Sequence, residues 1–390
     1  MRFSEFNNIY LASTLEQITK KVDRKASEQC NIPVMMISCG NGFILQSEKY
    51  SKDNAGQSLQ KYTLLKKGEL AYNHGASKTK PFGVCYVLKE RDEALVPFVY
   101  HCFAITNGIP KYWNYSLNTE QMDHQLKRIV SSGARMDGLL NISYQTYMLV
   151  KVYVPTNNEQ QKIADFLSLI DNRIDTQNKI IEDLELLEKE INNTIINKLV
   201  KYKDLVKFSS LYNFAKEGGT PNTSHPEYYT KGSIPFVKID DLTTKYLVSN
   251  QSFITKLGLE NSSAWLIPAN SILYSNGATI GAISINKYPV TTKQGILGIV
   301  PKSDYLSEYL YYFLRSNYFK KEICKITTQG TMKSAYIKDI DNILVPRINK
   351  KQQNEILTLL SEITLKIQKE KDMLELYKKQ KTYLLKNMFI

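Results

Sequence analysis

Two stretches of the chain, residues 154–200 and 345–390, repeat one pattern at an offset of 193 residues. Each opens with Val-Pro and a polar segment containing Gln-Gln, and then carries a sustained heptad pattern without proline or glycine. The polar interruptions of the heptads also coincide in the two copies. They are Gln177 with Glu370, and Glu188 with Lys381. Because matching breaks are difficult to obtain by chance, we infer a duplication.

The heptads predict two long helices that pair with each other, since their apolar stripe is too narrow for an ordinary core helix. Each helix is expected to run for about 40 residues, hence about 60 Å at 1.5 Å per residue. The predicted seam residues are Ile163, Leu167, Ile170, Ile174, Ile181 and Leu184 in the first helix, and Ile356, Leu360, Ile363, Ile367, Leu374 and Tyr377 in the second. Two independent surface helices are the alternative interpretation.

The segments that precede the two helices are related more weakly, at an offset of 202 residues. Ile32-Pro33 matches Ile234-Pro235, and residues 68–73 match residues 270–275. Both segments contain short β-type runs separated by Gly, Asn and Ser, which is typical of an irregular sheet with large loops. These runs are residues 62–65, 84–88, 234–239, 280–285 and 296–300.

We therefore predict a mixed α/β fold in which two modules alternate with two long helices. The predicted parts are module one at 1–153, a helical spacer at 154–204, module two at 205–345 and a second helical spacer at 346–390. A chain of 390 residues is too long for one ordinary core, and its 43% hydrophobic content indicates a globular protein.

Composition also narrows the location and the chemistry. No apolar run approaches the roughly 18 residues that a membrane span needs, and the first six residues are too polar for a signal peptide, so we expect a cytoplasmic protein. The five cysteines contain no Cys-x-x-Cys pair, so we expect neither a disulfide framework nor a metal site.

The net charge of +13 is distributed unevenly along the chain. Residues 1–157 carry 19 Lys and Arg against 13 Asp and Glu, and residues 205–347 carry 16 against 10. Residues 158–204, in contrast, carry 7 against 10. Two basic modules separated by an acidic helix favour two contacts on one nucleic acid over a single diffuse patch.

Motifs for catalysis are not evident in the sequence. It has no phosphate-binding Gly-x-x-x-x-Gly-Lys-Ser/Thr loop and no Asn/Asp-Pro-Pro-aromatic motif of the kind that amino-methyltransferases use. The stretch 218–221, Gly-Gly-Thr-Pro, is weak as a phosphate cradle. We therefore expect no catalytic residue in this chain. The alternatives are a divergent DNA methyltransferase or nuclease that acts alone, and a coiled-coil scaffold without a DNA role.

Polar loops between the expected elements supply candidates for DNA contact. Lys and Arg can neutralise phosphates, whereas Asn, Gln, Ser and Thr can bind base edges. The candidates are Asn73, Lys78, Lys80, Lys127, Arg128 and Arg135 in module one, and Lys216, Thr220, Ser275, Asn276, Thr328, Gln329 and Lys333 in module two. The alternative interpretation of each loop is a solvated turn.

Several short strings of residues, in this order, resemble those of the specificity (S) subunits of type I restriction-modification systems. They are residues 2–6 (Arg-Phe-Ser-Glu-Phe), 155–163 (Pro to Ile through Glu-Gln-Gln-Lys), 218–221 with 226–229 and 234–237, and 272–281. The resemblance covers nearly the whole chain. The second helix departs from the pattern, because Lys351 stands where Glu is usual and the loop before it is two residues longer. Module one also lacks the Gly-Gly-Thr-Pro start.

The resemblance implies a non-catalytic DNA-binding subunit that serves host defence. The two modules would be target recognition domains, each reading one half of a bipartite, asymmetric site on double-stranded DNA. The two helices would pair antiparallel, set the gap between the half-sites, and carry two modification (M) subunits. S-adenosylmethionine, ATP and Mg²⁺ would act on the M subunits and on restriction (R) subunits, with no cofactor in this chain and no membrane partner.

Overall fold

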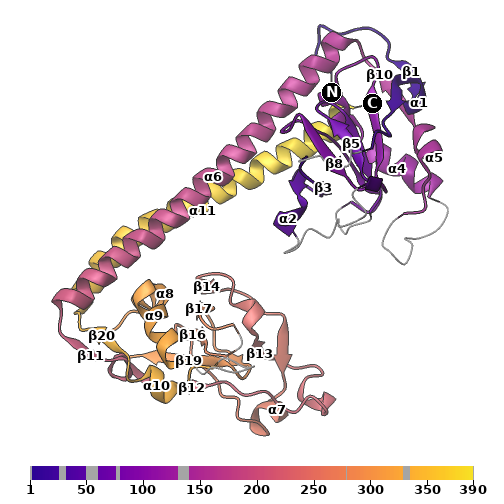
Figure 1. The fold of residues 1–390 in the computed structure, drawn as a ribbon. Helices are drawn as coiled ribbons and strands as arrows, with labels where there is room; N and C mark the ends of the chain where they lie inside the picture. The colour runs from indigo at the N-terminus through magenta and orange to yellow at the C-terminus, as the bar shows by residue number, and fades with distance from the viewer. Residues whose placement is uncertain are drawn as a thin grey trace. The chain divides into compact units, whose positions relative to one another are not determined.

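The computed structural model describes residues 2–25, 32–49, 60–75, 80–130, 140–277, 279–327 and 334–389. It divides into two compact units, each drawn in Figure 1. Unit 1 comprises Met1–Asn178 and Met373–Ile390, and unit 2 comprises Lys179–Asp372. Each unit therefore contains one predicted module together with part of both long helices. Within the described residues, no helix is both long enough and apolar enough to cross a membrane.

Unit 1 is built around a four-stranded antiparallel sheet of order β2-β9-β6-β7. Two antiparallel sheets of two strands each, β3-β4 and β5-β8, lie beside it. The strands are β1 Leu11–Thr14, β2 Thr19–Lys21, β3 Met35–Ser38, β4 Gly42–Leu45, β5 Thr63–Lys66, β6 Leu70–Asn73, β7 Val84–Val87, β8 Glu93–Val96, β9 His101–Ile105 and β10 Lys151–Val154. The short helices are α1 Leu15–Ile18, α2 Gln46–Lys49, α3 Pro110–Ser116, α4 Glu120–Ile129 and α5 Tyr144–Met148.

The sheet of unit 1 is buried on both faces, because alternate residues of a strand point to opposite sides. Leu70 and Tyr72 of β6 belong to a core that also contains Trp113 of α3. Ala71, between them, packs into a second core with Leu65 of β5. The near-continuous apolar runs of the sequence reflect this two-sided burial.

Unit 2 repeats the arrangement with a five-stranded sheet of order β12-β19-β16-β17-β14, beside a three-stranded sheet of order β15-β13-β18. Its strands are β11 Leu205–Lys207, β12 Tyr212–Glu217, β13 Ile234–Val237, β14 Tyr246–Leu247, β15 Ser252–Ile254, β16 Ile272–Ser275, β17 Ile283–Asn286, β18 Thr291–Thr292, β19 Ile296–Pro301 and β20 Leu344–Pro346. Its short helices are η2 Phe208–Leu211, η3 Pro226–Tyr228, η4 Ile239–Asp241, α7 Lys256–Glu260, α8 Ser307–Arg315, α9 Asn317–Ile326 and α10 Ile337–Ile340.

The weak repeat between the modules is confirmed by their topology. Strands β6 and β16, which the 202-residue offset aligned, hold the same place in the orders β9-β6-β7 and β19-β16-β17. The strand that opens each module also pairs antiparallel with the strand that precedes the long helix, β1 with β10 and β11 with β20. Each module therefore begins and ends at the base of a long helix.

The two long helices are α6, Asn157–Tyr202, with 46 residues, and α11, Lys350–Met388, with 39 residues. Inside unit 1, Asp171 of α6 pairs with Lys381 of α11. Further along α6, the Arg173 guanidinium lies over the ring of Tyr377, which is 4 residues closer to the start of α11 than Lys381 is. Because the partner number falls as the α6 number rises, the helices are antiparallel there.

Unit 2 contains the other halves of the two helices, and they pair in the same sense. Glu185 of α6 pairs with Lys371, and Glu188 pairs with Thr364. The partner number again falls along α6, so the predicted mixed α/β fold with an antiparallel helix pair is confirmed within each unit. Figure 1 shows α6 and α11 side by side. All the predicted seam residues are buried or half-buried.

The Gln-Gln motif at the start of each long helix contains one completely buried glutamine. The Gln160 amide donates to Pro155 O over 2.9 Å, and its Oε1 accepts from the backbone N–H of Ile109, just before α3, over 2.9 Å. This buried glutamine thereby satisfies a backbone donor at the start of α3.

Gln353 does the same work for unit 2. Its amide donates to Asp304 O over 2.8 Å and to Ile348 O over 3.5 Å, and its Oε1 accepts from Leu306 N, just before α8, over 2.8 Å. The repeated motif therefore fastens the first turn of each long helix to a short helix of the preceding module.

The residue before each buried glutamine distinguishes the two helix starts. Glu159 is completely buried and accepts from Arg2 Nε at 2.6 Å, from Arg2 Nη2 at 2.7 Å and from Tyr10 OH at 2.8 Å. Gln352, its counterpart, instead forms a capping box with Asn349, through bonds of 2.9 and 3.1 Å. The N-terminal Arg-Phe-Ser-Glu-Phe string is thus tied to α6.

Candidate nucleic-acid interface

Three connections meet at one edge of the five-stranded sheet of unit 2. They follow β12, follow β16 and precede β19, which end or begin at the same edge because the strands are antiparallel. Gly295 N donates to Glu217 Oε1 over 2.7 Å, and Asn276 N donates to Gly295 O over 3.0 Å. Gln294 N donates to Thr220 Oγ1 over 3.3 Å. The structure therefore brings the predicted candidates Lys216, Thr220, Ser275 and Asn276 to one edge.

These four residues differ in accessibility. Lys216 is exposed on β12 and Thr220 is half-buried, whereas Ser275 and Asn276 are buried. Ser275 Oγ has no hydrogen-bond partner among the described residues. The expectation of a polar loop at 275–276 was therefore wrong about exposure, because both residues continue a central strand into the core. Thr328, Gln329 and Lys333 lie outside the described residues.

The Gly-Gly-Thr-Pro string is explained by close packing of backbone at this edge. A Cβ added to Gly218 would lie 2.2 Å from Thr292 Oγ1, and one added to Gly219 would lie 2.3 Å from Ala264 N. Only glycine leaves room for such an approach. The two glycines therefore fit the loop after β12 against its neighbours.

Asn276 clasps the segment that leads into α10. Its Nδ2 donates to Ala335 O over 3.1 Å, and Ala335 N donates back to Asn276 O over 3.0 Å. Asn276 thereby fixes the position of Ala335, which lies shortly before α10.

Module one has the same clasp at the residue 202 positions earlier, His74. Leu140 N donates to His74 O over 2.9 Å, and His74 Nδ1 lies within hydrogen-bond distance of Leu140 O, at 2.8 Å, as Nε2 does of Val99 O. His74 was not among the site residues predicted from the sequence, although the 202-residue offset makes it equivalent to Asn276. We refer to the pairs His74–Leu140 and Asn276–Ala335 as the clasps.

A second histidine supports the clasp of module one. The ring of His101, at the start of β9, stacks on His74 with centroids 5.0 Å apart, and its Nε2 donates to Ile142 O over 3.1 Å. Burial, with a smaller contribution from the neighbouring His74, lowers the pKa of His101 to about 4. The ring of His101 therefore stays neutral over the physiological range of pH.

The other described candidates of module one lie at the end of β6 and on or against α4. Asn73 Oδ1 accepts from Gly75 N over 2.9 Å, which closes a turn at the end of β6. Lys80 Nζ lies 3.3 Å from Asp123 Oδ2 and donates to Asn118 O over 2.9 Å, so its charge is already paired. Lys127 and Arg128 are exposed in the last turn of α4. Lys78 and Arg135 lie outside the described residues.

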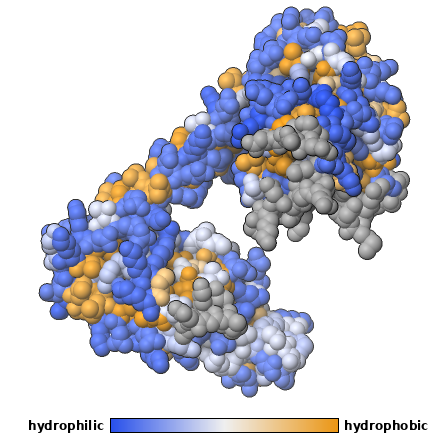
Figure 2. Space-filling view, in the orientation of Figure 1, coloured by the Kyte–Doolittle hydropathy of each residue, from blue (hydrophilic) through white to orange (hydrophobic). Residues whose placement is uncertain are grey.

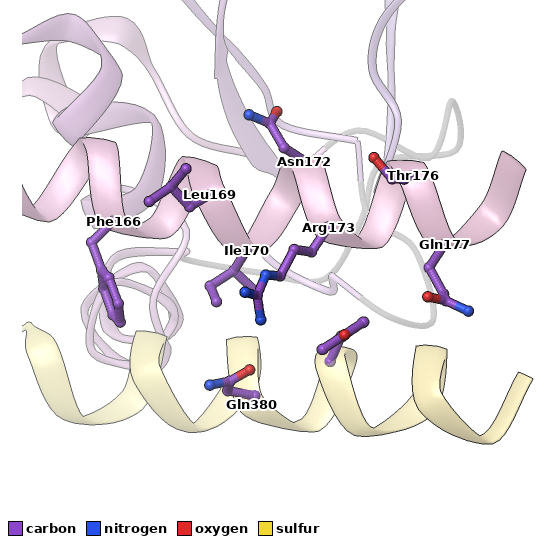
Figure 3. Close-up of a pocket in the computed structure, with 9 residues that line it drawn as sticks. Phe166, Leu169, Ile170, Asn172, Arg173, Thr176, Gln177 and Gln380 are labelled. Atoms are coloured by element: carbon purple, nitrogen blue, oxygen red, sulfur yellow. The ribbon is translucent and has the colours of Figure 1, made fainter. Parts of the chain in front are cut away.

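No catalytic constellation is evident in the described residues. They contain no group of three or more His, Cys, Asp or Glu side chains placed to hold a metal ion. A pocket of about 500 Å³ lies along α6 and α11 in unit 1. Figure 3 shows Arg173 and Gln177 reaching from α6 toward α11 there. The lining consists of apolar, amide and hydroxyl side chains with one guanidinium, and it holds no carboxylate, histidine or thiol.

Comparison with solved structures shows that the fold is shared across the whole chain. A chain from the study "Structural basis underlying complex assembly and conformational transition of the type I R-M system" superposes with a TM-score of 0.61 at 12% identity, over 98% of both chains. The type I restriction-modification S subunit from M. genitalium superposes with a TM-score of 0.53 at 17% identity, over 100% of this chain and 99% of that one.

Comparison of sequences places the chain more narrowly. Residues 197–376 match the family described as the type I restriction modification DNA specificity domain. The chain is 32% identical over 209 residues to the type I restriction enzyme MjaIX specificity subunit of Methanocaldococcus jannaschii, which covers 52% of this chain and 47% of that relative. It is 26% identical over 225 residues to the EcoR124I/EcoR124II specificity subunit of Escherichia coli, over 55% of each. Over these parts the chain is therefore similar in sequence to type I restriction enzyme specificity subunits.

The match spans about half the length of these specificity subunits. The matched residues 197–376 cover the end of α6, all of module two and most of α11. Module one lies outside the match, yet it has the same sheet order and the same clasp as module two. The repeated architecture therefore links the unmatched module to the matched part of the chain.

Proposed function

We propose that the chain is the DNA-recognition subunit of a type I restriction-modification complex. Its target recognition domains are residues 1–153 and 205–345, and its helical spacers are residues 154–204 and 346–390. One observation carries the proposal: two modules with the same sheet order begin and end at the bases of two continuous, antiparallel helices. Two modules on a stiff spacer bind jointly only where two half-sites have the matching separation and helical phase.

The two half-sites differ in sequence, because the equivalent edges of the modules differ. Asn73-His74-Gly75 ends β6 where Ser275-Asn276-Gly277 ends β16. The exposed cations Lys127, Arg128 and Lys216 supply charge for phosphates. The buried Asn276, together with Thr220, contributes by holding the loops of the edge in place through contacts with Ala335 and Gln294, and Ser275 is buried beside them.

The long helices carry two M subunits, and R subunits join through that complex. Large apolar side chains are exposed along both helices, which is typical of surfaces that bind another protein. They are Leu169, Ile180, Leu186, Leu187, Leu359, Leu365, Leu376 and Tyr383. Figure 2 shows apolar residues interrupting the hydrophilic surface. The chain itself is non-catalytic, and S-adenosylmethionine, ATP and Mg²⁺ act on the partner subunits in the cytoplasm, where the DNA is.

The test is to map methylated bases in a host that contains the chain with its M subunit, before and after residues 205–345 are exchanged for those of a related chain. We expect one half-site to change, while the other half-site and the gap stay the same. A change of both half-sites would refute the modular reading of DNA.

The purified chain alone, given S-adenosylmethionine, Mg²⁺ and DNA, should neither methylate nor cut. Product formation by the chain alone would indicate a divergent methyltransferase or nuclease. Failure of the chain bound to its M subunit to shift DNA of the mapped sequence would favour a scaffold.

A further inference from the structure

The polar interruption of the helix seam in unit 1 connects three elements. Lys381 Nζ of α11 lies 2.6 Å from Asp171 Oδ1 of α6. The other carboxylate oxygen, Asp171 Oδ2, accepts from Tyr115 OH over 2.6 Å, and Tyr115 belongs to α3 of module one. A chain of polar contacts therefore runs from the module, through its own helix, to the opposite helix.

Unit 2 contains the same connection with different chemistry. Thr364 Oγ1 of α11 donates to Glu188 Oε1 of α6 over 2.5 Å. Tyr312 OH, on α8 of module two, lies 2.7 Å from the same Thr364 hydroxyl. Because the threonine proton is used by the carboxylate, the tyrosine is the donor. Arg315 Nη1 also lies 3.8 Å from Glu188 Oε2.

The two connections are equivalent by position. Thr364 follows Asp171 by 193 residues and Lys381 follows Glu188 by 193 residues, which is the offset of the helix repeat. Their tyrosines lie on the short helices that Gln160 and Gln353 fasten in the same way. We call the sets Tyr115–Asp171–Lys381 and Tyr312–Thr364–Glu188 the latches. Each joins a module to both long helices although the residue types differ, so the junction was retained while its chemistry changed.

The latches are poorly suited to a role in stability alone. The side chains of Asp171 and Lys381 are 28% and 33% exposed, and that of Glu188 is 13% exposed. Ion pairs and polar groups at such depth lose in desolvation most of what they gain in attraction. Misalignment, however, would leave a half-buried charge without its partner. A polar residue in an apolar seam therefore selects one alignment at little gain in stability.

We infer that the two latches are positioning devices that hold each recognition module in one orientation on the helix pair, and thereby restrict the gap that the protein accepts between the half-sites. This inference rests on the proposed function. Adding or removing one base pair rotates one half-site relative to the other by about 35°. A module that can rock on its helices tolerates that rotation, and a latched module does not.

The test uses the full chain bound to its M subunit, with Lys381→Met and Glu188→Met made singly and together. Methionine keeps the seam apolar, and both tyrosine contacts remain, to Asp171 and to Thr364. The substrates carry the two mapped half-sites with the parent gap, or with a gap one base pair shorter or longer. The measured quantity is the ratio of methylation rates on the parent gap and on the altered gaps.

We expect the double variant to keep both half-sites, while its preference for the parent gap falls by about tenfold, which corresponds to about 1.4 kcal/mol. Lys381→Arg made alone should keep the parent preference, because an arginine can replace the lysine that pairs with Asp171. Lys371→Met is the matched control, since the Glu185–Lys371 pair spans the same helices but is 49% and 47% exposed. It should leave the preference unchanged.

Two results would overturn the inference. One is an unchanged gap preference in the double variant. The other is an equal loss of methylation on every gap together with a lower melting temperature, which is what a purely structural contact predicts. If instead the parent complex shows no bipartite site with a fixed gap, the proposed function itself fails.

Discussion

Module one and module two place different residues in the same structural positions. The clasp is a histidine in module one and an asparagine in module two, yet both bind the backbone of the returning segment at the same two atoms. The latches differ likewise, with an anion and a cation in unit 1 and a hydroxyl and an anion in unit 2. The repeat preserves geometry and leaves the side-chain chemistry free, which under the proposed function would allow two domains of one topology to read different half-sites.

The largest difference in unfolding free energy between variants of the two units is expected at the starts of the long helices. Glu159→Ala removes a completely buried carboxylate with two arginine bonds and one tyrosine bond, so unit 1 should lose about 3 kcal/mol. Gln352→Ala breaks only a capping box, so unit 2 should lose about 1 kcal/mol. Urea unfolding followed by hydrogen exchange in β6 and β16 checks both. Equal losses would show that the two helix starts are energetically alike.

We expect variants of the two clasps to lose similar amounts of folding free energy, and each to affect binding to a different half-site. His74→Ala and Asn276→Ala each leave a buried carbonyl without its side-chain donor, so each should cost about 1–3 kcal/mol. Each variant should weaken binding to one half-site only, measured with DNA in which the other half-site is scrambled. His74→Asn, which installs the module-two residue, should recover more than alanine does. Loss at both half-sites from one variant would contradict separate modules.

Acid should destabilise unit 1 through His101. Its folded pKa of about 4 lies below its ordinary 6.5, so the unfolded chain takes up a proton first as the pH falls. The stability that the neutral ring contributes is complete above pH 6.5 and declines toward pH 4, with a slope of up to about 1.4 kcal/mol per pH unit. His101→Phe should flatten that part of the stability profile, and an unchanged slope would remove His101 as its source.

The smallest effects are expected from the exposed cations. Lys127→Ala with Arg128→Ala in module one, and Lys216→Ala in module two, should each leave folding unchanged and weaken binding on all sequences alike. If these side chains neutralise phosphates, the slope of log affinity against log salt should become shallower by about one per cation removed. Titrations between low and physiological salt measure it. An unaltered slope would exclude the altered residue from the contact surface.

The helices and their seams were predictable because they follow from local periodicity. Ile163, Leu167 and Ile170 recur at heptad spacing, and such a stripe must be covered by another apolar surface, which is α11 together with the core of module one. Five β-type runs were also expected, and β7 and β19 lie within two residues of theirs, whereas most of the other described strands were not predicted from the sequence. The 202-residue offset also aligned β6 with β16 correctly.

The candidate interface was predictable only in part. Polarity suggested exposed loops at Ser275 and Asn276, but these residues sit at the end of a central strand and are buried. Lys80 was expected to be available, and it is paired with Asp123. Composition reports which residue types are present in a segment, whereas burial depends on what the rest of the chain places against it. DNA contact by the predicted residues remains a prediction.

The sequence by itself determined the duplication, the two long helices, the alternating order of modules and helices, and the basic charge of both modules. These properties are local in the chain or are visible as repeats. Only the tertiary structure decided which residues the polar breaks at Glu188 and Lys381 contact, and which residues the buried glutamines and the clasps hold. Those partners lie 47 to 210 residues away, and periodicity shows that a side chain is buried without showing what it contacts.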